Sequence, residues 1–251
     1  MAGTALQRRL IWRTGDVLDL VDETPRVRSL VLSVPGWPGH QAGQHVDVRL
    51  TAEDGYQAQR SYSIASAPAA GERLTLTVER LDDGEVSPYL AAELRPSDKL
   101  ELRGPIGGYF VWDVALGGPL LLVAGGSGIC PLMAMLRLRQ GAASTVPTRL
   151  LYSSRSLEDV IYREELDQFV ALGTGLEVIH TLTRGVAEGW TGFHRRIDTE
   201  MLSAVAWPPS EQPLSFICGP TPLVESAAES LVHLGHEPHH IKTERFGPSG
   251  G

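Results

Sequence analysis

The chain changes its structural period near residue 113, and this change limits the folds open to it. Before that point, short segments of strand character alternate with turns rich in Gly, Pro and Asp, such as PGWPGHQAG and LDDGE. We predict strands at 16–21, 27–34, 45–50, 61–65, 74–81 and 99–103, and one short helix at 88–94 with Ser87 as its N-cap. Six short strands joined by tight turns are typical of a small antiparallel barrel.

After residue 113, strands alternate with helices. The predicted strands are 120–124, 149–153, 177–181, 214–218 and 240–246, and the predicted helices are 131–140, 158–172, 199–206 and 222–234. Apolar strands such as LLLVA and LSFIC indicate a parallel sheet that helices cover on both faces. We therefore expect a barrel domain over residues 1–115 and an α/β domain over residues 116–251, which includes a Gly-rich C-terminal tail.

Composition and charge limit the class of protein further. The net charge of −8 disfavours binding to nucleic acid or to an acidic membrane surface. Two cysteines, Cys130 and Cys218, are too few for a disulfide framework or for a C-x₄-C-x₂-C iron–sulfur cluster. The histidines of HEPHH lack a second group of spaced ligands, so we predict no metal site. Without a signal-like or membrane-length apolar run, the sequence favours a soluble cytoplasmic protein.

A glycine-rich turn follows the first strand of the second half, within LLLVAGGSGICPLMAML. Gly125, Gly126 and Gly128 allow a close backbone approach, and the free N–H groups of the following helix attract an anion. The turn departs from the G-x-G-x-x-G fingerprint because Pro131 stands at the third glycine position. Its place after the first strand of an α/β unit nevertheless favours phosphate binding.

The next strand ends in LLYSSRS, without the acidic residue that would bind a ribose 2′-hydroxyl. Ser153, Ser154 and Arg155 instead offer hydroxyl donors and a cation, which suit a 2′-phosphate. Taken alone, this stretch is typical of a solvated turn. Beside the glycine turn it favours NADPH over NADH.

The stretch QRSYSIASAP carries polar side chains on both faces of a predicted strand. Because side chains alternate along a strand, Arg60 and Tyr62 share one face while Ser61 and Ser63 share the other, and neither face is apolar before Ile64. Two interpretations fit this pattern: an exposed edge strand, or a strand whose polar groups meet a ligand.

Six motifs follow one another in a recognisable order. They are RSYS at 60–63, GEVSPYL at 84–90, RGPIGGYF at 103–110, GGSGICPL at 125–132, ICGP at 217–220 and TERF at 243–246. Over roughly residues 16–246 the chain resembles the ferredoxin–NADP reductase superfamily, specifically the single-flavin reductase modules of bacterial oxygenase systems. The resemblance implies a flavin-binding barrel followed by a pyridine-nucleotide α/β domain, in agreement with the two periods.

The resemblance also implies roles for residues of the barrel. In the R-x-Y-S motif, Arg60 would pair with the flavin pyrophosphate, Tyr62 would pack against the isoalloxazine ring, and Ser63 would approach the N5 edge. The other cofactor-binding candidates on the flavin side are Ser61, Val78, Glu79, Arg80, Gly84, Val86, Ser87 and the ring-covering Phe246, with backbone contacts expected at 78–80. FAD is the expected flavin and FMN the alternative.

In the second half, the resemblance implies a nicotinamide-nucleotide site. Its candidates are Gly126, Ser127, Gly128 and Ile129 for the phosphates, Ser154, Arg155 and Arg195 around the adenosine ribose, and Cys218, Gly219 and Pro220 at the nicotinamide edge. Glu244 would handle a proton or orient the nicotinamide. The catalytic candidates are thus Ser63, Cys218 and Glu244.

The expected function is electron transfer through bound FAD, from NAD(P)H to a separate ferredoxin, oxygenase component or other metalloenzyme. Two alternatives stay open. One is an NAD(P)H-dependent flavin or ferric reductase, and the other is a non-catalytic flavin-binding sensor or electron-transfer subunit.

Overall fold

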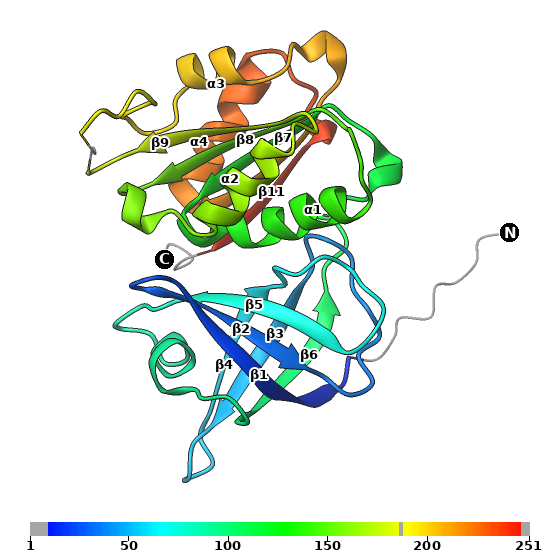
Figure 1. Cartoon of the computed structure of the whole chain (residues 1–251), viewed down its shortest axis with the longest axis vertical. Coiled ribbons are helices and arrows are strands. Elements are labelled where there is room, and N and C mark those ends of the chain that lie inside the picture. Colours follow the sequence, from blue (N-terminus) through cyan, green and yellow to red (C-terminus); the bar gives the residue numbers. More distant parts are fainter. Residues whose placement is uncertain (1–9, 186–187, 247–251) are drawn as a thin grey trace, which may run out of the picture.

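The computed structural model describes residues 10–185 and 188–246, and it contains two sheets of different kinds, one above the other in Figure 1. The first sheet is antiparallel throughout, with strand order β4-β3-β6-β1-β2-β5. Its strands are β1 Trp12–Thr24, β2 Val27–Ser33, β3 His45–Thr51, β4 Gln57–Ser63, β5 Arg73–Glu79 and β6 Lys99–Ile106. A bridge between Ile64 and Leu76 joins the two edges of this sheet, so the predicted six-stranded barrel is confirmed.

Two of the barrel strands differ in extent from the prediction because of their partners. Strand β1 begins four residues earlier than expected, since its first part pairs with β6 and its second part pairs with β2. Strand β4 begins at Gln57 rather than at 61, because it pairs with the whole length of β3. Such pairing across a sheet extends strands into polar sequence that carries little strand signal of its own.

The short helix after β5 also differs from the prediction. It is a single π-helical turn, Tyr89–Glu93, and its buried Leu90 packs into the barrel core. The predicted N-cap is wrong, because the Ser87 hydroxyl accepts a hydrogen bond of 3.1 Å from the backbone N–H of Leu81 instead. This bond folds the loop that precedes the helix back onto itself.

The second sheet is parallel, with strand order β11-β10-β7-β8-β9. Its strands are β7 Leu120–Gly125, β8 Thr148–Ser154, β9 Leu176–Leu182, β10 Leu214–Pro220 and β11 Ile241–Phe246. The helices are α1 Ile129–Gly141, α2 Arg163–Ala171, α3 Thr199–Val205 and α4 Thr221–His233. Alternate residues of β7 face opposite layers: Leu120 and Leu122 pack with α1, whereas Leu121 and Val123 pack with α3 and α4. The predicted α/β arrangement is confirmed.

The helix predicted at 158–172 is shorter than expected. A 3₁₀ turn at Leu157–Asp159 closes with a capping box between Ser156 and Asp159, and α2 begins only at Arg163. Between them, Tyr162 adopts φ 60°, a left-handed conformation that a bulky residue rarely takes. Its buried hydroxyl hydrogen-bonds the hydroxyl of Thr77 on β5. A contact with the barrel therefore interrupts the helix.

Helix α1 lies between the parallel sheet and the barrel (Figure 1). One core cluster contains its residues Leu132 and Met135, strand residues of the parallel sheet, and Ala65 and Phe110 of the barrel half. Arg137 of α1 donates a hydrogen bond of 2.8 Å to the carbonyl of Ala65. Apolar packing and hydrogen bonds thus hold the two halves in one orientation. Within the described chain, no helix has both the length and the apolar character needed to cross a bilayer.

The chain reverses its direction of strand addition between β7 and β10. Parallel sheets bind ligands at such switch points, at the carboxyl ends of the strands. Here the backbone at the end of β10 packs closely against β7 and the turn that follows it. A Cβ on Gly128 would lie 2.2 Å from the carbonyl oxygen of Cys218, and a Cβ on Gly219 would lie 3.2 Å from the backbone nitrogen of Gly125. The absence of a side chain at these glycines therefore allows the backbones of β10 and of the turn after β7 to pack closely at the switch point.

We expect Gly128→Ala to lower the free energy of unfolding by about 3 kcal/mol, because the added methyl group overlaps rigid backbone at Cys218. Gly141→Ala is the matched control, since a Cβ there meets nothing within 4 Å. It should leave stability unchanged or raise it by about 0.5 kcal/mol. Urea unfolding of the two variants measures both effects, and equal stabilities would contradict the backbone clash.

Candidate functional site

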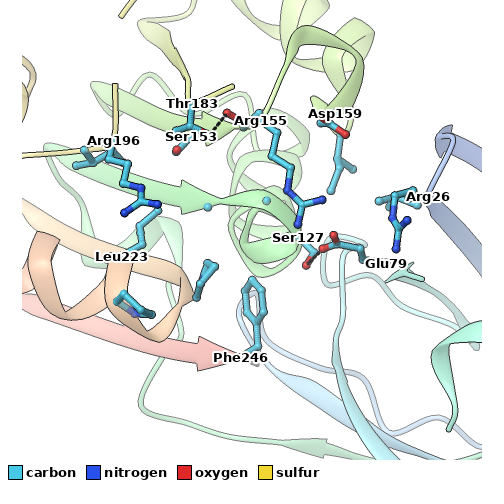
Figure 2. Close-up of a pocket in the computed structure, with 18 of the residues that line it drawn as sticks. Arg26, Glu79, Ser127, Ser153, Arg155, Asp159, Thr183, Arg196, Leu223 and Phe246 are labelled. Atoms are coloured by element: carbon cyan, nitrogen blue, oxygen red, sulfur yellow. Dashed lines mark hydrogen bonds between the residues drawn. The ribbon is translucent and has the colours of Figure 1, made fainter. Parts of the chain in front are cut away.

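A pocket of about 540 Å³ opens at the switch point, between the parallel sheet and the barrel (Figure 2). The nucleotide half contributes the turn after β7, the end of β8 and the start of α4, while the barrel contributes its β1–β2 hairpin and the end of β5. The residues that line it include Arg26, Glu79, Ser127, Ser154, Arg155, Arg196 and Phe246. The pocket thus belongs to both halves of the chain.

The glycine turn forms the floor of this pocket. Gly126 has φ 54°, which glycine adopts without strain, and with Ser127 it leads directly into the N-terminus of α1. The Ser127 hydroxyl donates a hydrogen bond of 2.8 Å to Oε2 of Glu79, which lies at the end of β5 in the barrel. Ile129 is fully buried in the core beneath the turn, so its side chain serves packing.

The end of β8 brings hydroxyl groups and a cation to the same pocket. Ser154 is 4% exposed, and its Oγ has no hydrogen-bond partner among the described residues. A buried hydroxyl without a protein partner indicates a place for a polar ligand. Arg155 is exposed and, in Figure 2, its guanidinium points toward Ser127 and Glu79. The predicted phosphate-binding stretches therefore converge on one pocket.

Two adjacent arginines, Arg195 and Arg196, follow β9. The predicted candidate, Arg195, does not line the pocket, whereas Arg196 does. Arg195 turns away from the pocket and forms ion pairs with Asp198 at 2.7 Å and with Glu200 at 3.2 Å. Its neighbour Arg196 lines the pocket, across from Arg155 (Figure 2). The two were indistinguishable in sequence. Their directions follow from the loop geometry, in which the Arg195 carbonyl accepts a hydrogen bond from Thr181.

The ends of β10 and β11 bring Cys218 and Glu244 side by side, because these residues are partners in the strand register. Cys218 is 1% exposed, and burial, followed by the nearby Glu244 charge, raises its thiol pKa well above the ordinary value. Oε2 of Glu244 is buried with no hydrogen-bond partner among residues 10–185 and 188–246, and burial raises the pKa of Glu244 to about 7. Near neutral pH this carboxyl group therefore exchanges a proton.

A histidine of the barrel, His45 on β3, faces Glu244 across the interface. Its Nδ1 lies 3.6 Å from Oε1 of Glu244, and burial lowers the pKa of His45 below its ordinary value. His45 is also the register partner of Ser63 on β4. Ser63 and Glu244, two of the three catalytic candidates, thus lie next to His45, whereas Cys218 lies next to Glu244. No sequence motif indicated His45.

The R-x-Y-S strand is β4, and it places Arg60 beside the loop 84–87, which holds further flavin-side candidates. Arg60 forms a salt bridge of 2.6 Å with Glu85, which follows Gly84 in the loop before the short helix. Tyr62 packs partly against the barrel core, and burial raises its pKa to about 12. Ser61 lies on the opposite face of the strand and donates a hydrogen bond of 2.7 Å to Asp47. The structure brings Arg60 and the 84–87 loop together and turns Ser61 away from them.

The remaining barrel candidates divide into core residues and exposed ones. Val78 and Val86 are fully buried in the barrel core, so only their backbone remains for a ligand, as expected for 78–80. Arg80 lines a second hollow of about 330 Å³ that shares Arg26 with the main pocket. Arg26, from the β1–β2 hairpin, carried no motif signal, because only the fold brings that hairpin to the pocket.

The residues fit a flavin and a nicotinamide nucleotide better than a metal ion. Two buried polar atoms lack protein partners among the described residues: Ser154 Oγ, whose residue lines the pocket, and Glu244 Oε2, whose residue faces His45 at the interface. Exposed guanidinium groups stand where phosphates were expected, at Arg60 and Arg155. In the described chain, no group of three or more His, Cys, Asp or Glu side chains could hold a metal ion.

Two family models match successive stretches of the chain. Residues 24–111 match the model of the oxidoreductase FAD-binding domain, and residues 122–229 match that of the oxidoreductase NAD-binding domain. A ferredoxin–NADP reductase B of Sorangium cellulosum is 36% identical over 218 residues, which cover 82% of this chain and 85% of that protein.

Two further similarities extend this finding. A glycine betaine monooxygenase reductase subunit of Chromohalobacter salexigens is 31% identical over 82% of this chain, but the match spans only 55% of that longer protein. A crystal structure of a Neisseria gonorrhoeae ferredoxin NADP+ reductase with bound FAD and NADP has the same fold. It superposes with a TM-score of 0.79 at 21% identity, covering 93% of this chain and 98% of that one. The expected family is confirmed: this chain belongs to the ferredoxin–NADP reductase superfamily.

Proposed function

We propose that the chain is an NAD(P)H-dependent flavoprotein reductase that takes a hydride onto bound FAD and passes single electrons to a redox protein. One observation carries this proposal. A single pocket joins the phosphate turn of the α/β half to Glu79 of the barrel and to Phe246 at the end of β11. The order of the FAD-binding and NAD-binding matches along the chain supports the same reading.

Bound FAD would supply the redox chemistry, because a flavin accepts a hydride from a reduced nicotinamide and passes electrons on singly. The residues of this chain would hold and shield it. Arg60 would pair with the pyrophosphate and Tyr62 would lie against the ring, while Phe246 at the end of β11 would cover it. Their task is to fix the two cofactors relative to each other and to exclude water.

Glu244 would hold the proton at this site. Its pKa of about 7 lets the carboxyl group gain or lose a proton near neutral pH, and His45 lies 3.6 Å away on the barrel side. Cys218 stays a neutral thiol because burial raises its pKa, and it would pack at the nicotinamide edge. Ser63, beside His45, would donate a hydrogen bond to the flavin edge.

NADPH is the nucleotide that the pocket favours. Ser154 offers an unpartnered buried hydroxyl, and Arg155 and Arg196 provide two cations from different loops. A 2′-phosphate would take its charge-assisted hydrogen bonds from these groups. The names of the relatives, a ferredoxin–NADP reductase and a monooxygenase reductase subunit, support a ferredoxin or an oxygenase component as the electron acceptor.

Anaerobic rapid mixing of the purified protein with each nucleotide tests the proposal. We expect both NADPH and NADH to bleach the flavin absorbance, with NADPH half-saturating at the lower concentration. Arg196→Ala should raise the NADPH concentration for half-saturation about tenfold, through the lost charged hydrogen bond, and should leave NADH nearly unchanged.

Arg195→Ala is the matched control, because the side chain of Arg195 pairs with Asp198 and Glu200 outside the pocket. It should leave the half-saturating concentrations of both NADPH and NADH unchanged. Bound flavin that neither nucleotide reduces would refute the reductase and favour a sensor or subunit. Equal effects of Arg196→Ala on NADPH and NADH would refute the 2′-phosphate contact.

We expect Arg60→Ala to weaken flavin binding by about ten- to a hundredfold, the worth of one or two charged hydrogen bonds to phosphate. Arg73→Ala, at the exposed start of β5, is the control and should retain flavin. Flavin fluorescence during equilibrium dialysis measures both. Retention by Arg60→Ala equal to that of the wild type would show that the R-x-Y-S strand does not hold the pyrophosphate.

The raised pKa of Glu244 predicts a pH-dependent stability. The folded chain keeps the Glu244 proton up to about pH 7, whereas the unfolded chain loses it near the ordinary glutamate pKa. The contribution of Glu244 to the free energy of unfolding therefore falls as the pH rises between these two pKa values. Glu244→Gln cannot ionise. Relative to it, the wild type should lose about 2 kcal/mol between pH 5 and pH 8, a value discounted for partial exposure. Parallel pH profiles in urea unfolding would refute the buried neutral carboxyl group.

A further inference from the structure

A carboxylate of the barrel occupies the phosphate turn of the nucleotide half. Oε2 of Glu79 accepts a hydrogen bond of 2.8 Å from the Ser127 hydroxyl, and the same oxygen lies 4.0 Å from the position that a Cβ of Gly126 would take. Glu79 is half-buried and lines the pocket together with this turn. Figure 2 shows its carboxylate between the turn, Arg155 and Arg26. The side chain thus stands where the electrostatic field favours an anion.

A carboxylate and a phosphate compete for such a position. The N-terminus of α1 carries the positive end of the helix dipole, which attracts negative charge of either kind. The Ser127 hydroxyl has one proton, so it cannot donate to Glu79 and to a phosphate oxygen at once. Two anions near one turn also repel each other, and the repulsion is only partly screened in a pocket.

Holding the two halves together does not require this charge. The Tyr162 hydroxyl already bonds Thr77 of the barrel, and Arg137 already bonds the carbonyl of Ala65. A neutral glutamine at position 79 would still accept the hydrogen bond from Ser127 through its amide oxygen. The negative charge of Glu79 therefore calls for a role other than connecting the halves.

We propose that Glu79 lowers the affinity of the chain for its nucleotide, because its carboxylate competes with the nucleotide phosphates for the turn and must leave Ser127 when NAD(P)H or NAD(P)+ binds. This inference rests on the proposed function. The competition from Glu79 would lower the affinity of the chain for both the reduced and the oxidised nucleotide. Uniformly weak binding favours release of the oxidised nucleotide after hydride transfer.

A charge series at position 79 tests the inference through binding alone. The dissociation constants of NADP+ and NAD+ are measured calorimetrically with the flavin-containing wild type, Glu79→Gln and Glu79→Lys. We expect Glu79→Gln to bind both nucleotides about two- to fivefold more tightly, the size of one partly exposed charge pair, and Glu79→Lys to bind them more tightly still. The difference should shrink in high salt.

Glu53→Gln is the control, since Glu53 is exposed in the turn between β3 and β4 and its removal changes the net charge equally. It should bind like the wild type. If the wild type binds nucleotide and both Glu79 variants bind it equally or more weakly, the carboxylate assists the nucleotide or only connects the halves, and the inference is wrong. If none of the proteins binds either nucleotide, the proposed function itself fails.

Discussion

The packing of α1 on two sides at once is the interaction on which the rest of the structure depends. An ordinary surface helix buries one apolar stripe, but residues 129–136 are all buried, because one side of the helix packs on the parallel sheet and the other on the barrel. The helix begins directly at the glycine turn. Fixing it between the two halves therefore fixes the glycine turn against the barrel, and with it the shape of the pocket.

The two halves bring different chemistry to this pocket. The α/β half supplies hydroxyl groups and cations from loops at the carboxyl ends of its strands, among them Ser154 and Arg196, as such sheets generally do. The barrel supplies a carboxylate to the pocket at Glu79, and outside the pocket lining its His45 faces Glu244 at the interface. Burial at the interface then adjusts the acid–base groups, since it favours the neutral forms of Glu244, Cys218 and His45.

Local sequence patterns correctly predicted those elements that are determined by neighbouring residues in the chain. The turn after β7 and the apolar strands of the parallel sheet follow from glycine geometry and hydrophobic runs, and they agree with the structure. The predictions were wrong where a contact with a residue elsewhere in the chain determines where a helix begins or how it is capped. Tyr162 leaves the predicted helix to reach Thr77, and Ser87 bonds Leu81 instead of capping its helix. Of the adjacent Arg195 and Arg196, only loop geometry tells which one faces the pocket.

The sequence by itself therefore determined the two-part architecture, the glycine turn and the family, because period, glycine placement and motif order are properties of short stretches of chain. Only the tertiary structure decided which distant side chains meet. Glu79 and Ser127 are 48 positions apart, and His45 and Glu244 lie on different sheets. Their meeting depends on how α1 seats the α/β half against the barrel, and no local pattern encodes a contact made by long-range packing.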